Sequence, residues 1–152
     1  MRTNPTSAVT KRARIKARRN TVQALYGRFM TGKSAAEVIA EFESDEQTLA
    51  KSDVDYFKLL LKGTIKNSEA LDARLKELVD RPVEELDAIE RAILHIGCYE
   101  LEHHIEIPWR VVLNESIELA KLFGAEQSHK YINGILDKVA RELRTAEIDS
   151  IS

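Results

Sequence analysis

Basic side chains are concentrated at the start of the chain, where they could bind the phosphates of a nucleic acid. No acid precedes Glu37, so the first 36 residues carry a charge of +9. The cations are Arg2, Lys11, Arg12, Arg14, Lys16, Arg18, Arg19, Arg28 and Lys33. The remaining 116 residues hold 14 basic and 25 acidic side chains, a charge of −11, and the net charge of −2 hides this division. Such asymmetry is typical of a basic arm or helix for an anionic polymer, joined to an acidic body.

Three other interpretations of this basic segment stay open. It could be a solvated helix face without a partner, an N-terminal targeting peptide or, over residues 1–7, a flexible tail. A targeting peptide is disfavoured because the segment runs without a boundary into an apolar helical pattern that a globular core needs. A secretory signal is excluded because no apolar stretch of the usual length follows the charges.

A second candidate contact region is the sequence His129-Lys130-Tyr131 near the end of the chain. Lys130 could hold an RNA backbone while the Tyr131 ring stacks on an unpaired base, a mode typical of single-stranded RNA. The alternative is that Tyr131 is an ordinary packing residue. Nothing in the sequence resembles a helix-turn-helix reader or a zinc finger.

Little in the sequence supports catalysis or metal binding. Cys98 has His95 three residues before it, but two candidate ligands do not make a tetrahedral site, and a lone cysteine is often a small buried hydrophobe. No phosphate-binding glycine loop, dinucleotide fingerprint or nucleophile elbow occurs. We therefore expect a protein that is not an enzyme and holds no metal and no cofactor. The single cysteine suits a reducing, cytoplasmic compartment, and no apolar run is long enough to cross a membrane.

Helices must position these residues, because the apolar spacing predicts helix almost throughout the chain. We expect helices over 8–30, over 34–42 behind a Ser34/Glu37 capping box, over 53–78 behind an Asp53 cap, from about Leu86 through Ile96, from Pro108 to a C′ glycine at Gly124, and from a Ser128 cap to Leu143. No alternating segment bounded by hairpin signals indicates a sheet. The predicted fold class is all-α, a helical bundle of about seven helices.

The first of these helices has a face that is basic in one half and apolar in the other. Lys11, Arg14 and Arg18 point nearly the same way as Leu25 and Phe29 two turns later. Because unpaired buried charges are too costly, the basic half should stand at the rim of the bundle, available to a partner.

Several motifs then follow one another along the chain. They are an arginine-rich helix ending in Val22-Gln23-Ala24-Leu25-Tyr26, then Asp55-Tyr56-Phe57, Leu86-Asp87-x-Ile89-Glu90-Arg91, Glu118-Leu119-Ala120-Lys121 with Phe123-Gly124, and Ser128-His129-Lys130-x-x-Asn133-Gly134-x-Leu136-Asp137-Lys138. In this order they resemble the NusB family of bacterial transcription antitermination factors, over about Arg12 to Arg144.

The resemblance implies two three-helix lobes and a set of partners. The protein would bind BoxA-type single-stranded RNA in ribosomal-RNA leader transcripts together with the small-subunit ribosomal protein NusE. Both would join an RNA polymerase elongation complex with other Nus factors. Matched positions assign RNA binding to Arg12, Arg14, Lys16, Arg18, Lys130 and Tyr131, and contact with the ribosomal protein to Tyr26 and Glu90. Relatives occur as monomers and as homodimers, so a homodimer stays open.

This chain departs from some relatives at Ile15, which replaces an arginine, at Arg19, which replaces an acid, and at Gln127, which replaces an aspartate. We expect a flexible N-terminal segment over 1–7, a single all-helical RNA-binding domain over 8–145, and a flexible tail over 146–152. The rival hypothesis is a helical protein-interaction scaffold or homodimer without specific RNA recognition. No membrane is expected among the partners.

Overall fold

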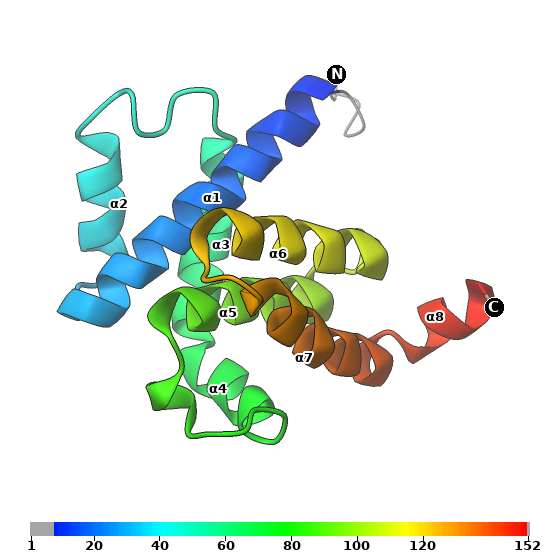
Figure 1. Cartoon of the computed structure of the whole chain (residues 1–152). Coiled ribbons are helices and arrows are strands. Elements are labelled where there is room, and N and C mark those ends of the chain that lie inside the picture. Colours follow the sequence, from blue (N-terminus) through cyan, green and yellow to red (C-terminus); the bar gives the residue numbers. More distant parts are fainter. Residues whose placement is uncertain (1–7, 152) are drawn as a thin grey trace. The chain divides into compact units, whose positions relative to one another are not determined.

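The computed structural model describes residues 8–151, and these residues are almost entirely helical (Figure 1). Within this range there are eight α-helices, one short 3-10 helix and no strand. The predicted all-α fold class is therefore confirmed. The segment 1–7, which we expected to be flexible, lies outside the described residues.

The chain divides into two compact units, the first ending at Lys66 and the second beginning at Asn67. The first unit contains α1 (Ala8–Thr31), α2 (Ala35–Glu43) and α3 (Val54–Lys66). The second contains α4 (Ser68–Lys76), η1 (Val83–Glu85), α5 (Ala88–His103), α6 (Trp109–Phe123), α7 (Ser128–Leu143) and α8 (Thr145–Ile151). The first unit has the three helices that were predicted for a lobe. The second has three long helices, α5 to α7, two short α-helices, α4 and α8, and the 3-10 helix η1.

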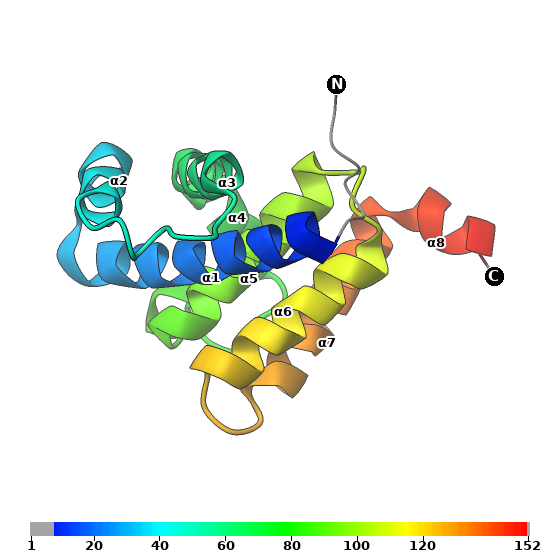
Figure 2. The same cartoon turned by 90° about the horizontal axis from the view of Figure 1, so that it is seen from above.

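In the first unit, α1 crosses α3 and packs on it, and α2 packs on both (Figure 2). Val22 and Leu25 of α1 and Phe57 and Leu60 of α3 are buried, as their helical spacing predicts. The predicted capping box is present, because the Ser34 hydroxyl accepts from the Glu37 amide at 3.1 Å and the Glu37 carboxylate accepts from the Ser34 amide. These local signals fix where α2 begins.

The predicted helix over residues 53–78 is wrong in its length. Its start is correct, since the Asp53 carboxylate accepts from the Tyr56 amide at 3.0 Å and caps α3. The helix then ends at Lys66, and Asn67 leaves the helical region with φ −100° and ψ 15° before α4 begins. Asn67 and Ser68 are weak helix formers whose side chains compete for backbone hydrogen bonds, which explains the interruption. Gly63 lies inside α3 and does not end it.

In the second unit, α5, α6 and α7 pack on one another and α4 packs on α5. Gly97 of α5 allows a close approach of the helices, because an added Cβ there would lie 2.6 Å from Cδ1 of Leu136 and 3.1 Å from Oγ of Ser116. Gly124 also lies where a side chain would clash, because a Cβ there would lie 2.8 Å from the Ala120 carbonyl oxygen. Helix α6 ends at Phe123, so Gly124 terminates it as predicted, but Gly124 occupies the C-cap with a φ of −89° rather than the C′ position.

Two further predictions at helix starts need correction. Ser128 is the first residue of α7 rather than its cap, and its hydroxyl is directed to another helix. The cap position belongs to Gln127, which has a left-handed φ of 75°. Residues 145–151 form α8, where a tail was expected from residue 146. A helix of 7 residues with no apolar period of its own carries no signal in the sequence.

Candidate nucleic-acid interface

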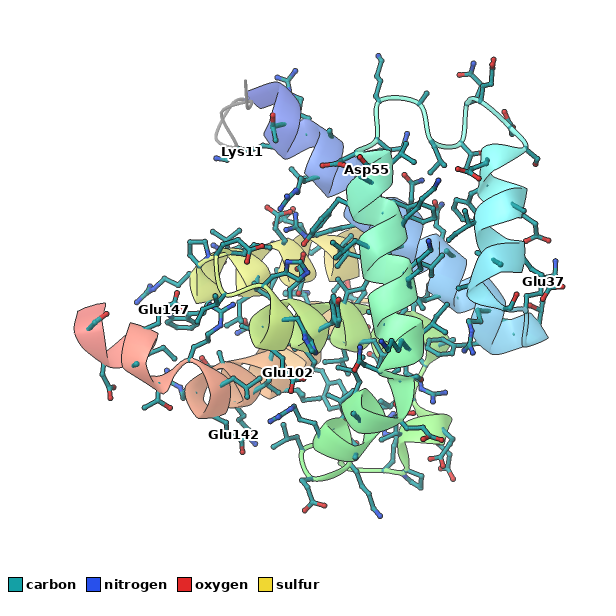
Figure 3. The ribbon with its side chains drawn as sticks, turned by 180° about the vertical axis from the view of Figure 1, so that it is seen from behind. Lys11, Glu37, Asp55, Glu102, Glu142 and Glu147 are labelled. Atoms are coloured by element: carbon teal, nitrogen blue, oxygen red, sulfur yellow. The ribbon has the colours of Figure 1, made fainter. Side chains whose placement is uncertain are left out.

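The basic side chains of α1 differ in how much of their surface is exposed to solvent. Arg12 is exposed, and so is Lys11, which is labelled in Figure 3 on the N-terminal part of α1. Arg14 and Lys16 are half-buried, and Arg18 is only 5% exposed. The predicted basic ridge is therefore open at its N-terminal end and closed at Arg18.

The less exposed cations, Arg14, Lys16 and Arg18, contact the start of α3 and the loop before it. The Arg14 guanidinium lies 4.0 Å from the centre of the Tyr56 ring, and its Nε is 3.6 Å from a carboxylate oxygen of Asp53. Arg18 lies 5.5 Å from the same ring. Lys16 donates to the Ala50 carbonyl at 3.2 Å. Cation–π contacts and a part-exposed ion pair orient the basic side chains and leave their charge in place.

The second candidate region, at the start of α7, is more organised than its sequence indicated. Lys130 is exposed and Tyr131 is half-buried. The Tyr131 hydroxyl donates to Oδ1 of Asp80 at 3.0 Å, and the Arg81 guanidinium lies 5.5 Å from the centre of the Tyr131 ring. Burial, and then the hydrogen bond to Asp80, raise the pKa of Tyr131, so the phenol stays protonated and continues to donate.

Asp80 and Arg81 were not singled out from the sequence. Their signal is weak, because an acid followed by an arginine before Pro82 reads only as a turn between helices. The contact with Tyr131 spans 51 residues, a distance over which sequence periodicity carries no information.

The two residues assigned to protein contact lie in different units. Tyr26 on α1 is 41% exposed, and Met30, one turn later, is 64% exposed, so this face of α1 presents apolar surface. Glu90 lies in the first turn of α5 and accepts a hydrogen bond at 2.9 Å from the buried Ser128 hydroxyl. This bond ties Glu90 to the beginning of α7, three residues before Tyr131.

The second unit also holds the cysteine and histidine considered for catalysis or metal binding. Cys98 is fully buried, and burial raises the pKa of its thiol to about 12, which disfavours the reactive thiolate. His95 is bonded through Nε2 to Asp72 at 2.7 Å, and Arg91 binds the other Asp72 oxygen at 2.6 Å. These contacts favour packing and structural roles. Over residues 8–151 no group of three or more potential metal ligands comes together, and no helix could span a membrane.

Comparison with known proteins gives a consistent result. A sequence profile described as the NusB family matches residues 15–141. The transcription antitermination protein NusB of Alcanivorax borkumensis is 50% identical over 138 residues, covering 91% of each chain. That of Thiobacillus denitrificans is 47% identical over 133 residues, covering 88% of this chain and 91% of its own.

Solved structures agree with the fold. A crystal form of NusB from T. maritima is 27% identical, has a TM-score of 0.72, and covers 84% of this chain and 90% of its own. A second structure, of the antitermination factors NusB and NusE in complex with double-stranded RNA, matches with a TM-score of 0.74 at 22% identity. It covers 84% of this chain and 96% of the matched chain.

Proposed function

This chain belongs to the NusB family, and we propose that it is a transcription antitermination factor that binds RNA together with a small ribosomal protein. The RNA is a BoxA-type single-stranded segment of ribosomal-RNA leader transcripts, and the protein partner is NusE. The assembled factors join the RNA polymerase elongation complex with other Nus factors. The proposal includes no catalytic step, and as a transcription factor the protein would act in the cytoplasm.

The observation that carries this proposal is the identity of 50%, over almost the full length, with a relative named as an antitermination protein. The charge distribution supports it independently, since the first helix carries an array of cations that an isolated acidic body would not need. The acidic remainder of the chain suits a basic ribosomal protein.

We propose that RNA is held at two regions. Arg12 and the half-buried Arg14 and Lys16 would contact backbone phosphates, with Arg18 positioned behind them by its burial. Lys130 and Tyr131 would form the second contact, with the tyrosine ring against an unpaired base. Tyr26 and Glu90 would meet the ribosomal protein.

The deciding experiment measures binding of a BoxA-like RNA and of a scrambled RNA of the same composition, each with and without the ribosomal protein. We expect tighter binding of the BoxA-like RNA, a further gain when the ribosomal protein is present, and a steep loss of affinity with salt. Equal affinity for both RNAs, with no gain from the partner, would favour a helical scaffold without RNA recognition.

A further inference from the structure

The turn between α4 and η1 carries an arginine that the proposed site does not yet use. Arg81 binds the neighbouring Asp80 carboxylate through two hydrogen bonds, Nε to Oδ1 at 2.9 Å and Nη2 to Oδ2 at 3.3 Å. The same Oδ1 accepts from the Tyr131 hydroxyl at 3.0 Å. Asp80 therefore fixes an arginine and an aromatic ring at the same time.

The Arg81 guanidinium still has hydrogen-bonding capacity. A guanidinium has five N–H donors, and Asp80 takes one from Nε and one from Nη2, which leaves three. The side chain is 44% exposed, so these donors are accessible from solvent. Pro82, which follows directly, restricts the backbone of Arg81 and limits where the side chain can reach.

An unpaired nucleotide could bind here through its base and its phosphate. The Tyr131 ring would stack on the base, and Arg81 and Lys130 supply positive charge for the phosphate. The guanidinium lies 5.5 Å from the centre of the Tyr131 ring, within the range of a cation–π contact, and Lys130 precedes the tyrosine on the same turn of α7. A base stacked on tyrosine brings its sugar and phosphate to the same part of the surface, and a planar arginine binds a phosphate through paired hydrogen bonds.

We propose that Arg81 is a further RNA-contacting residue, which binds a backbone phosphate beside the base that stacks on Tyr131, and that Asp80 positions both side chains. This inference rests on the proposed RNA binding and deepens it by adding a contact from the α4–η1 turn. Hydrogen bonds from Arg81 and then from Tyr131 lower the pKa of Asp80, so the carboxylate stays ionised and keeps its hold throughout the neutral range.

The first test replaces Arg81 by alanine and measures affinity for a BoxA-like RNA, with the ribosomal protein present, at several salt concentrations. We expect binding to weaken about tenfold or more and the slope of log affinity against log salt to fall by about one unit. R81K should retain the slope, because the charge remains, while losing part of the affinity.

Arg141→Ala is the matched control. Arg141 lies in the last turn of α7, at the opposite end from Tyr131, and its Nε binds Asp137 at the same 2.9 Å. The variant removes an equal charge from another exposed ion pair that is also made through Nε, and we expect it to leave the salt slope unchanged. Equal effects of R81A and R141A would overturn the contact.

The second test concerns Asp80 as a positioning residue. D80A and D80N both remove a negative charge near the RNA. If Asp80 only repelled the RNA through its charge, both variants would bind RNA more tightly than the natural protein. We expect D80N to bind at least as tightly as the natural protein, because its amide oxygen still accepts from Tyr131 and Arg81. D80A should bind more weakly, because both side chains lose their acceptor. Equal tightening by D80A and D80N would overturn the positioning role.

These outcomes separate the inference from the proposed function. If the natural protein binds the BoxA-like RNA but R81A matches R141A, only the Arg81 contact fails. If the natural protein shows no RNA preference at all, the proposed function fails, and the Arg81 contact fails with it. Thermal melts of each variant should match the natural protein, since the side chains of Arg81, Asp80 and Arg141 are 44%, 66% and 60% exposed.

Discussion

At the scale of single residues, burial decides which cations can exchange their contacts for phosphate. Arg12 is exposed, so its removal should act on RNA binding alone. Arg18 is 5% exposed against Tyr56, so its removal would also disturb the packing of α1 on α3. A loss of RNA affinity in an Arg18 variant is therefore ambiguous, whereas the same loss in an Arg12 variant reports a contact.

The buried Cys98 thiol makes a prediction about reactivity. We expect an alkylating reagent at neutral pH to modify the folded protein far more slowly than the urea-unfolded protein, because burial raises the pKa of the thiol to about 12. Comparable rates in the two states would show that the site opens readily or is not buried.

The same residue predicts how stability depends on pH at the alkaline end. The thiol pKa is raised in the folded protein, so its contribution to stability is complete below the ordinary value near 9.0 and is lost as pH rises toward 12. Cys98→Ala lacks this titration, and its free energy of unfolding should fall less steeply above about pH 9 than that of the natural protein. Parallel curves for the two proteins would contradict the raised pKa.

Gln127 has a backbone conformation that its side chain does not favour. Its φ of 75° lies in the left-handed region, where glycine carries no steric penalty. Gln127→Gly should therefore raise the free energy of unfolding, or leave it unchanged within about 1 kcal/mol. Glu126→Gly is the control, because Glu126 has no positive φ and glycine there should destabilise. Denaturant melts of the two variants distinguish these outcomes.

At the scale of elements, one arginine joins the end of α5 to the start of α6. All five N–H donors of the buried Arg144 are used, on the carbonyls of Glu100, Leu101, His104 and Ile107 and on the Glu147 carboxylate. The other oxygen of Glu147, which is labelled in Figure 3, accepts from the Trp109 amide at 2.9 Å. The pair places a cation at the C-terminus of α5 and an anion at the N-terminus of α6, as the helix dipoles favour.

Removing this junction should cost much more than removing a surface pair. We expect Arg144→Ala to lower the free energy of unfolding by about 3–5 kcal/mol, because four carbonyls and a carboxylate lose their donor. Arg141→Ala, three residues earlier, breaks an exposed pair with Asp137 and should cost about 0.5 kcal/mol or less. Urea unfolding measures both values, and similar losses would mean that the Arg144 contacts contribute little.

The elements show where sequence information ends. The Ser34/Glu37 box and the Asp53 cap are local contacts of three residues, and the sequence predicted both. Arg14 against Tyr56 and Arg144 against the α5 carbonyls join residues more than 40 positions apart. Periodicity predicts which face of a helix is buried, but the polar partners of a face depend on which helices meet there. The second contact region was therefore located from the sequence, while its Asp80–Arg81 support was not.

At the scale of the whole molecule, the opposed charges of +9 and −11 are consistent with the proposed binding of both an RNA and a basic protein by a nearly neutral chain. The cations proposed for RNA occur in both units, with Arg12 on α1 of the first and Lys130 on α7 of the second. Binding by both regions at once would make the salt dependence a sum of contributions from the two units.

Single and double variants test this sum. Arg12→Ala and Lys130→Ala should each lower the slope of log affinity against log salt by about one unit, and the double variant should lower it by about two. Lys66→Ala is the control, because Lys66 is an exposed cation at the far end of α3 from Asp53. Because the three side chains are exposed, fold stability should be unchanged, which separates lost contacts from lost structure. If Lys130→Ala leaves the slope unchanged while Arg12→Ala lowers it, the second unit makes no phosphate contact through Lys130, which would contradict a sum of contributions from the two units.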